Sequence, residues 1–88
     1  MSAIATARQA AALARNPSEE EAVANLSAGY QTMMRTAALA LEAGDERNAA
    51  RFRRKARRYH AALRLAAHGA NVVDVYARLT GSRPWGVA

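Results

Sequence analysis

Apolar residues recur at alternating spacings of three and four through most of this chain, and this periodicity constrains the fold more than any other feature. Two stretches carry it, separated by Gly44 and Asp45. The positions are Val23, Leu26, Tyr30, Met33, Ala37 and Leu41 in the first stretch, and Ala49, Phe52, Ala56, Tyr59, Leu63 and Ala66 in the second. Such spacing places the apolar side chains along one side of an α-helix. We therefore expect two long helices that pack against each other.

Local signals give the expected limits of these two helices. Ser18, followed by Glu21 three residues later, matches a capping box at a helix start. Gly44 suits the position after a helix end, and Asp45 suits the cap of the next helix. Because the junction is short, the two helices should form an antiparallel αα-hairpin. The expected register pairs Leu26 with Leu63, Tyr30 with Tyr59, Met33 with Ala56 and Ala37 with Phe52.

Two shorter helices should flank the hairpin. The first is Ala-rich, with a weak apolar face formed by Ile4, Ala7, Ala11 and Ala14. Asn16 should lie outside it, because the residue before a proline is pushed out of the helical region. Near Gly69 the phase of the apolar residues changes, which indicates a stop there and a new helix capped by Asn71. One continuous helix bent at Gly69 is the alternative.

The prediction is an all-α fold, a small helical bundle of three to four helices built around a central antiparallel αα-hairpin. The chain of 88 residues should form a single domain over 1–80, with helices at about 2–15, 18–43, 45–68 and 71–80, and a tail over 81–88. Residues 61–67 are apolar nearly all round except Arg64, so they should be covered on more than one side. The flanking helices could cover them, or a second subunit, and a chain this short is often marginal alone. A homo-oligomer therefore stays open.

The sequence does not predict a catalytic centre. His60 and His68 are eight residues apart, which is not the spacing of a zinc-binding pair on one helix. Glu19, Glu20 and Glu21 are consecutive and cannot converge on one ion, but they suit the positive end of a helix dipole. No Gly-rich phosphate loop occurs, and no serine has an evident base partner. We expect a protein that is not an enzyme, with no catalytic residue, no metal and no cofactor.

Composition bears on the setting of the protein. There is no cysteine, no apolar run long enough for a secretory signal and no stretch of about 20 apolar residues, so we expect a cytoplasmic protein without a membrane role. Alanine is abundant and arginine far outnumbers lysine. This bias is typical of a GC-rich coding sequence, and it favours a bacterial or phage source.

The positive charge is concentrated in one predicted helix. Between Asp45 and Arg64 there are eight basic residues and two acids, which account for the whole net charge of +6, because five arginines balance five acids elsewhere. The basic residues are Arg47, Arg51, Arg53, Arg54, Lys55, Arg57, Arg58 and Arg64. They cover the side of the helix away from the apolar positions. We regard them as the candidate binding residues.

The expected hairpin brings no acid beside this charge. Residues 51–58 should lie beside 31–38, which contain Arg35 and no acid. A merely solubilising face is one interpretation. The other is an external anion, either the phosphate backbone of DNA or RNA or an acidic protein surface. In the protein case the chain would be an adaptor or an inhibitor, of phage or mobile-element origin. Trp85 could then anchor the tail in the partner, or it could fold back on its own bundle.

Two short stretches resemble known motifs. The stretch from Met33 to Ala56 resembles one hairpin of a tetratricopeptide repeat, through Ala37, the Gly44–Asp45 turn, Ala49 and Ala56, which implies an αα-hairpin. It departs from the repeat at Ala40 and Arg53, where large aromatic residues are expected, and no second copy occurs. The residues Ala77-Arg78-Leu79 and Gly81-Ser82-Arg83-Pro84 resemble the turn of a helix-turn-helix DNA-binding motif. Too few residues follow Pro84 to supply the recognition helix of that motif.

Overall fold

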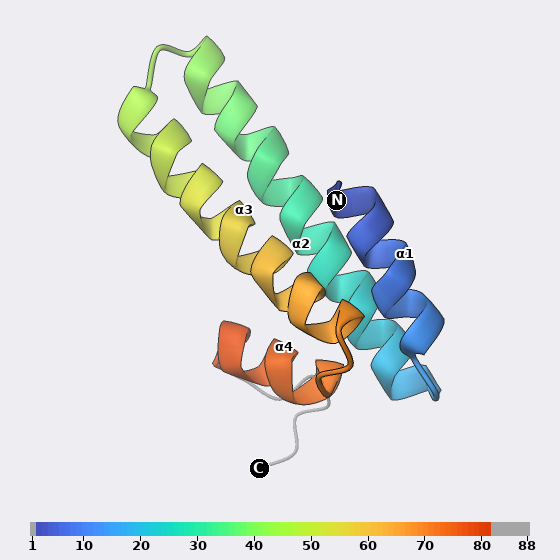
Figure 1. Cartoon of the computed structure of the whole chain (residues 1–88). Coiled ribbons are helices and arrows are strands. Elements are labelled where there is room, and N and C mark those ends of the chain that lie inside the picture. Colours follow the sequence, from blue (N-terminus) through green and yellow to red (C-terminus); the bar gives the residue numbers. More distant parts are fainter. Residues whose placement is uncertain (1, 82–88) are drawn as a thin grey trace.

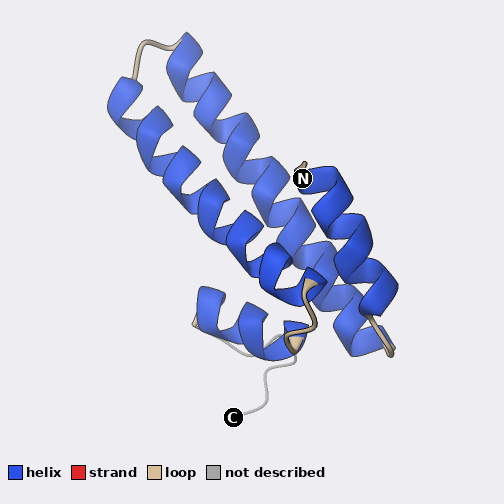
Figure 2. Cartoon of the chain, in the orientation of Figure 1, coloured by secondary structure: helices blue, strands red, loops and turns tan. Residues whose placement is uncertain are grey.

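The computed structural model describes residues 2–81 and has four α-helices there. They are α1 (Ala3–Leu13), α2 (Pro17–Glu42), α3 (Glu46–Ala67) and α4 (Val72–Thr80). Helices α2 and α3 form a long antiparallel hairpin, α1 lies along one end of it, and α4 packs at the same end (Figure 1). No strand occurs within residues 2–81 (Figure 2). The predicted all-α bundle around a central hairpin is confirmed.

The start of α2 differs from the prediction, because Asn16 and not Ser18 caps the helix. The Asn16 side chain accepts a hydrogen bond from the Glu19 backbone N–H at 2.9 Å, and the Glu19 carboxylate accepts one from the Arg15 backbone N–H at 3.1 Å. This exchange resembles a capping box two residues earlier than predicted. Pro17 permits it, because the first helical position needs no N–H donor.

Both predicted interruptions in the second half of the chain are present. Gly44 has φ +79°, and its N–H and that of Asp45 donate to the carbonyls of Leu41 and Ala40, which closes α2 as a Schellman motif. Asp45 then caps α3 by accepting from the Asn48 N–H at 3.1 Å. The chain turns again at Gly69, with φ +101°, and Asn71 caps α4. Helices α3 and α4 are thus separate, and the bent continuous helix is excluded.

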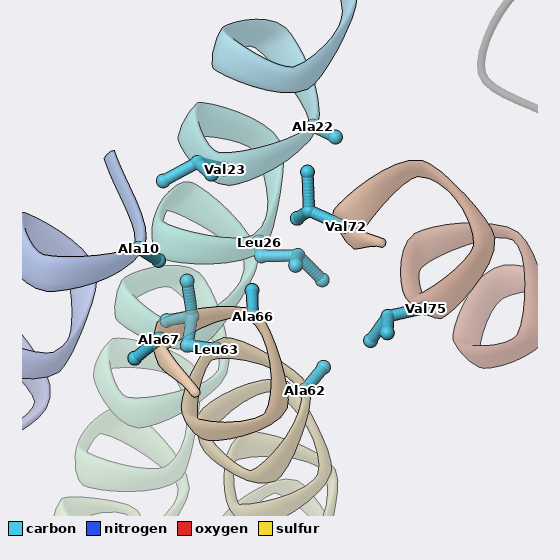
Figure 3. Packing of buried hydrophobic residues seen from close by; sticks show 10 residues of the cluster. All are labelled: Ala10, Ala22, Val23, Leu26, Ala62, Leu63, Ala66, Ala67, Val72 and Val75. Atoms are coloured by element: carbon cyan, nitrogen blue, oxygen red, sulfur yellow. The ribbon is translucent and has the colours of Figure 1, made fainter. Parts of the chain in front are cut away.

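The largest core cluster lies at the end of the hairpin where all four helices meet, which we call the base (Figure 3). Its buried residues are Ala10, Ala22, Val23, Leu26, Ala62, Leu63, Ala66, Ala67, Val72 and Val75. Helix α1 contributes Ala10 and α4 contributes Val72 and Val75, so the second half of α3 is covered on more than one side, as predicted. Ala61 and Leu65 are the exceptions among its apolar residues, since both are exposed and Leu65 is 56% exposed.

Helix α1 packs through a different face from the predicted one. Thr6 and Ala10 are its buried residues, whereas Ile4 is 66% exposed and Ala11 is exposed. The Thr6 hydroxyl can be buried because it donates a hydrogen bond to the Ser2 carbonyl at 2.9 Å. A threonine is therefore among the residues through which α1 packs, and its Oγ1 lies 3.4 Å from His60 Nε2 of α3.

Beyond α1 and α4 the hairpin continues as a pair of helices, which we call the arm (residues 34–56) (Figure 1). The buried residues of the arm are Ala37, Ala49 and Ala56. Phe52 is only half-buried between the two helices. The large buried side chains, Leu26 and Leu63, lie in the base. Most of the dense positive charge is therefore carried by the part of the fold with the smallest core.

Candidate anion-binding surface of helix α3

The basic residues of α3 are nearly all at the surface. Seven arginines are exposed, namely Arg47, Arg51, Arg53, Arg54, Arg57, Arg58 and Arg64. Lys55 is half-buried, and its ammonium lies 5.5 Å from the centre of the Phe52 ring. At this distance the cation and the ring attract each other. Lys55 is thus partly committed to the hairpin, whereas the arginines are accessible to a partner.

The arginines form two rows along α3. Arg47, Arg51, Arg54 and Arg58 follow one another at spacings of four, three and four, so they lie on one side of the helix over about 16 Å. We call this row the outer stripe. Arg53, Arg57 and Arg64 form a second row, the inner stripe, and it runs on the α1 side of the helix, since Arg64 lines a pocket with residues of α1. The two stripes present charge over a broad arc of α3.

The nearest acids do not neutralise the outer stripe. Both carboxylate oxygens of Asp45 accept hydrogen bonds from Asn48, through its backbone N–H at 3.1 Å and its side-chain amide at 2.7 Å. Beside the stripe, the adjoining part of α2 (31–38) contains Arg35 and no acid. Within residues 2–81, no carboxylate forms an ion pair with a basic side chain of α3. This part of the surface therefore carries a concentrated positive charge.

The register of the hairpin follows from two contacts between its helices. The Tyr59 ring lies against Gly29, and the Tyr30 ring lies 5.7 Å from the His60 ring at an interplanar angle of 59°. Paired positions thus fall within one residue of the predicted register, but the expected pairing of Tyr30 with Tyr59 is replaced by that of Tyr30 with His60. The difference arises because Gly29 leaves room for an aromatic ring to approach the α2 backbone.

A pocket of about 430 Å³ lies between α1 and α3. It is lined by Thr6, Gln9, His60, Arg64, Ala67 and His68. The spacing of His60 and His68 does not suit a zinc pair, and Arg64 is one of the eight predicted binding residues; the structure brings all three together at this pocket. The available signal was the spacing of His60, Arg64 and His68, which follow one another at intervals of four and so continue the inner stripe on one side of α3.

A second, more apolar depression lies between α3 and α4, with a volume of about 260 Å³. It is lined by the apolar residues Ala61, Ala62, Leu65, Val75 and Leu79 together with Arg58 and Arg78. Arg58 is also the last residue of the outer stripe. Exposed apolar surface thus adjoins one end of the charged row.

Some predicted features cannot be placed, because they lie outside the described part of the chain. Trp85 and most of the turn that resembles a helix-turn-helix motif lie outside the described residues. Within residues 2–81, no three histidine or acidic side chains are grouped so that they could hold a metal ion. None of the four helices is long and apolar enough to cross a membrane.

Comparisons with protein-family models, curated proteins and solved structures found no match for this chain.

Proposed function

We propose that this protein is a non-catalytic nucleic-acid-binding protein that holds phosphates on the outer stripe of α3. One observation supports the proposal above all others: four exposed arginines lie in a row beside a part of α2 that contains no acid. Arginine suits this role because its planar guanidinium binds phosphate oxygens in a bidentate manner. The row of about 16 Å is long enough to meet several phosphates of one backbone.

The arrangement costs the isolated protein some stability. Arg47 and Arg51, Arg54 and Arg58, and Arg53 and Arg57 are like charges one helical turn apart. Each such pair destabilises a helix by about 0.2–0.5 kcal/mol. A polyanion that lies along the stripe relieves this repulsion and gains favourable contacts. The charge distribution thus favours a bound anion over a bare solvent-exposed face.

The aromatic residues favour contacts to the backbone over stacking with bases. Tyr30, Phe52 and Tyr59 are half-buried in the hairpin, with Tyr30 and Tyr59 held by the contacts described above. Proteins that bind single strands without sequence preference commonly stack bases on exposed aromatic rings. A surface of arginines without such rings should bind largely independently of sequence, with a steep dependence on salt.

A titration with labelled duplex DNA, duplex RNA and single strands, at low and high salt, tests the proposal. The variant R51A/R54A/R58A removes three charges from the outer stripe. The control R8A/R15A removes two exposed charges away from α3, one from α1 and one from the α1–α2 loop. We expect the stripe variant to lose most of the binding at low salt and the control to keep most of it. Failure of the unchanged protein to bind any nucleic acid at low salt would refute the proposal.

A second experiment separates this function from that of a protein-binding adaptor or inhibitor. The apolar depression beside Arg58 and Arg78 is the observation that favours a protein partner. Affinity purification with and without nuclease distinguishes the two functions. Co-purifying nucleic acid that the stripe variant fails to retain supports our proposal. A stoichiometric protein that remains after nuclease treatment, with no nucleic acid bound in titrations, would replace it.

A further inference from the structure

The pocket between α1 and α3 is lined by polar and basic groups that the proposed function does not use. Arg64 and His68 are exposed on one side of it, His60 is half-buried, and Gln9 faces them from α1. No carboxylate is among the lining residues. A pocket of about 430 Å³ lies at the small end of the range for ligand sites, which is about 300–1,000 Å³. Its size suits a single charged group better than a length of backbone.

The contacts of His60 hold its ring in place at the pocket. The Nε2 atom lies 3.4 Å from Oγ1 of Thr6, a side chain that is 1% exposed. The Thr6 hydroxyl already donates its proton to the Ser2 carbonyl, so Oγ1 acts as the acceptor and His60 Nε2 as the donor. The His60 ring also makes a tilted contact with the Tyr30 ring of α2, with 5.7 Å between the ring centres. Residues of three helices therefore meet at this imidazole.

The groups around the His60 ring include basic side chains and no acid. Titratable or charged groups that face the ring are Tyr30 from α2 and Arg64 and His68 along α3, and α1 supplies only the neutral Thr6 and Gln9. No acid is among these neighbours, so the positive charge of Arg64 has no carboxylate beside it in the pocket. A bound anion is the partner that would meet this charge.

The spacing along α3 sets the donors side by side. His60, Arg64 and His68 are each four residues apart, which separates them by about 6 Å along the axis and keeps them on one side of the helix. Arg64 offers a planar fork of N–H donors, the imidazole of His68 offers one more, and the Gln9 amide faces them. Such a set matches a tetrahedral oxyanion with two negative charges.

We propose that this pocket binds a phosphate monoester group. The group could belong to a small phosphorylated molecule or to the terminal phosphate of a nucleic-acid strand. A strand end would have a continuous path, because Arg57 and Arg53 extend the inner stripe away from the pocket along α3. The pocket uses no residue of the outer stripe. An experiment can therefore contradict the phosphate site without contradicting the proposed function, and the reverse also holds.

Sulfate is the first probe, because it mimics the phosphate dianion and keeps its charge between pH 6 and pH 8. We expect sulfate to raise the thermal unfolding temperature more than chloride does at equal ionic strength, since a ligand that binds the folded state stabilises it. An equal response to sulfate and chloride would overturn the proposal.

Paired variants locate the effect. R64Q/H68Q changes two exposed side chains of the pocket, and it should abolish the specific response to sulfate and to inorganic phosphate while leaving the helical circular dichroism unchanged. R47Q/R58Q changes two exposed arginines of the outer stripe and should keep the response. Loss of the response in both variants to the same extent would show a diffuse effect of net charge and contradict the site.

Two oligonucleotides of one sequence then identify the source of the phosphate, one with a 5′-phosphate and one with a 5′-hydroxyl. If strand ends occupy the pocket, the 5′-phosphate should tighten binding about tenfold, as expected for a charged hydrogen-bonded group. R64Q/H68Q should remove that advantage. Equal affinity of the two strands, with the specific response to free phosphate retained, supports the site and assigns it to small phosphorylated molecules.

Discussion

The ring of Tyr59 in α3 lies against the backbone of Gly29 in α2. A Cβ atom added at Gly29 would lie 2.7 Å from both Cδ1 and Cζ of the ring, closer than such atoms pack. Glycine is costly in the middle of a helix, by about 1 kcal/mol relative to alanine. Its presence there is explained by the ring, which could not occupy this place over a side chain. The pair fixes how closely the two long helices approach.

We expect Gly29→Ala to destabilise the protein, although it improves helix propensity. Overpacking of this kind costs about 1–3 kcal/mol, which exceeds the gain of about 1 kcal/mol. Urea denaturation followed by circular dichroism measures the difference. The background Tyr59→Leu provides the control, because the ring is gone and the same substitution should then stabilise the protein. Stabilisation in both backgrounds would show that the ring yields to the added methyl group.

The position of the cap on α2 can be tested with two alanine substitutions. Asn16→Ala removes the acceptor of the Glu19 N–H, so it should lower the free energy of unfolding by about 1 kcal/mol. Ser18 lies inside the helix, so Ser18→Ala should change the free energy of unfolding by less than about 0.5 kcal/mol. Denaturant midpoints compare the two variants. A larger effect of Ser18→Ala than of Asn16→Ala would show that Ser18 caps the helix, as the sequence pattern predicted.

Truncation of two leucines of α3 should lower the stability by very different amounts. Leu63 is 1% exposed in the core cluster, and Leu63→Ala should cost about 2–5 kcal/mol of stability. Leu65 is 56% exposed at the depression beside α4, and Leu65→Ala should cost less than about 0.5 kcal/mol. Equilibrium unfolding at several protein concentrations measures both. A large, concentration-dependent loss for Leu65→Ala would reveal a second subunit on this face.

The salt dependence of nucleic-acid binding should report how many phosphates the outer stripe contacts. Each contact adds about 0.9 to the slope of log affinity against log salt for duplex DNA. If Arg51, Arg54 and Arg58 each meet a phosphate, R51A/R54A/R58A should reduce the slope by about 2.7. Anisotropy titrations over a series of salt concentrations give the slope. A slope that does not change would show that these side chains make no phosphate contact.

Much of the fold could be predicted, because it depends on interactions between residues that are close together in the sequence. Gly44 and Gly69 occupy turns with positive φ, and Asp45 and Asn71 cap the helices that follow, because each of these effects depends on only a few neighbouring residues. The hairpin register could be predicted to within one residue for a similar reason, since a short turn fixes which positions face each other. The cap at Asn16 was missed because two overlapping signals occur there, and Pro17 decides between them.

The packing of the flanking helices could not be predicted in the same way. The side of α1 that faces the core is set by Thr6 and Ala10, which periodicity alone does not rank above the larger Ile4. The pocket at His60 could not be predicted before α1 was placed, because two of its six lining residues, Thr6 and Gln9, come from α1. The arginines of α3 were evident from the sequence. That the inner stripe continues through His60 and His68 into a pocket was not, because α1 forms the other side of that pocket.

The division of the fold into base and arm has a consequence for motion. The arm buries three alanines and has no third helix over it, so local opening should cost it less free energy than the base. Its backbone amides should therefore exchange with deuterium sooner than those around Leu26 and Leu63. A polyanion on the outer stripe would offset the repulsion that favours opening. Binding of the polyanion would then favour the closed arm, and the size of this effect would depend on the ionic strength of the surroundings.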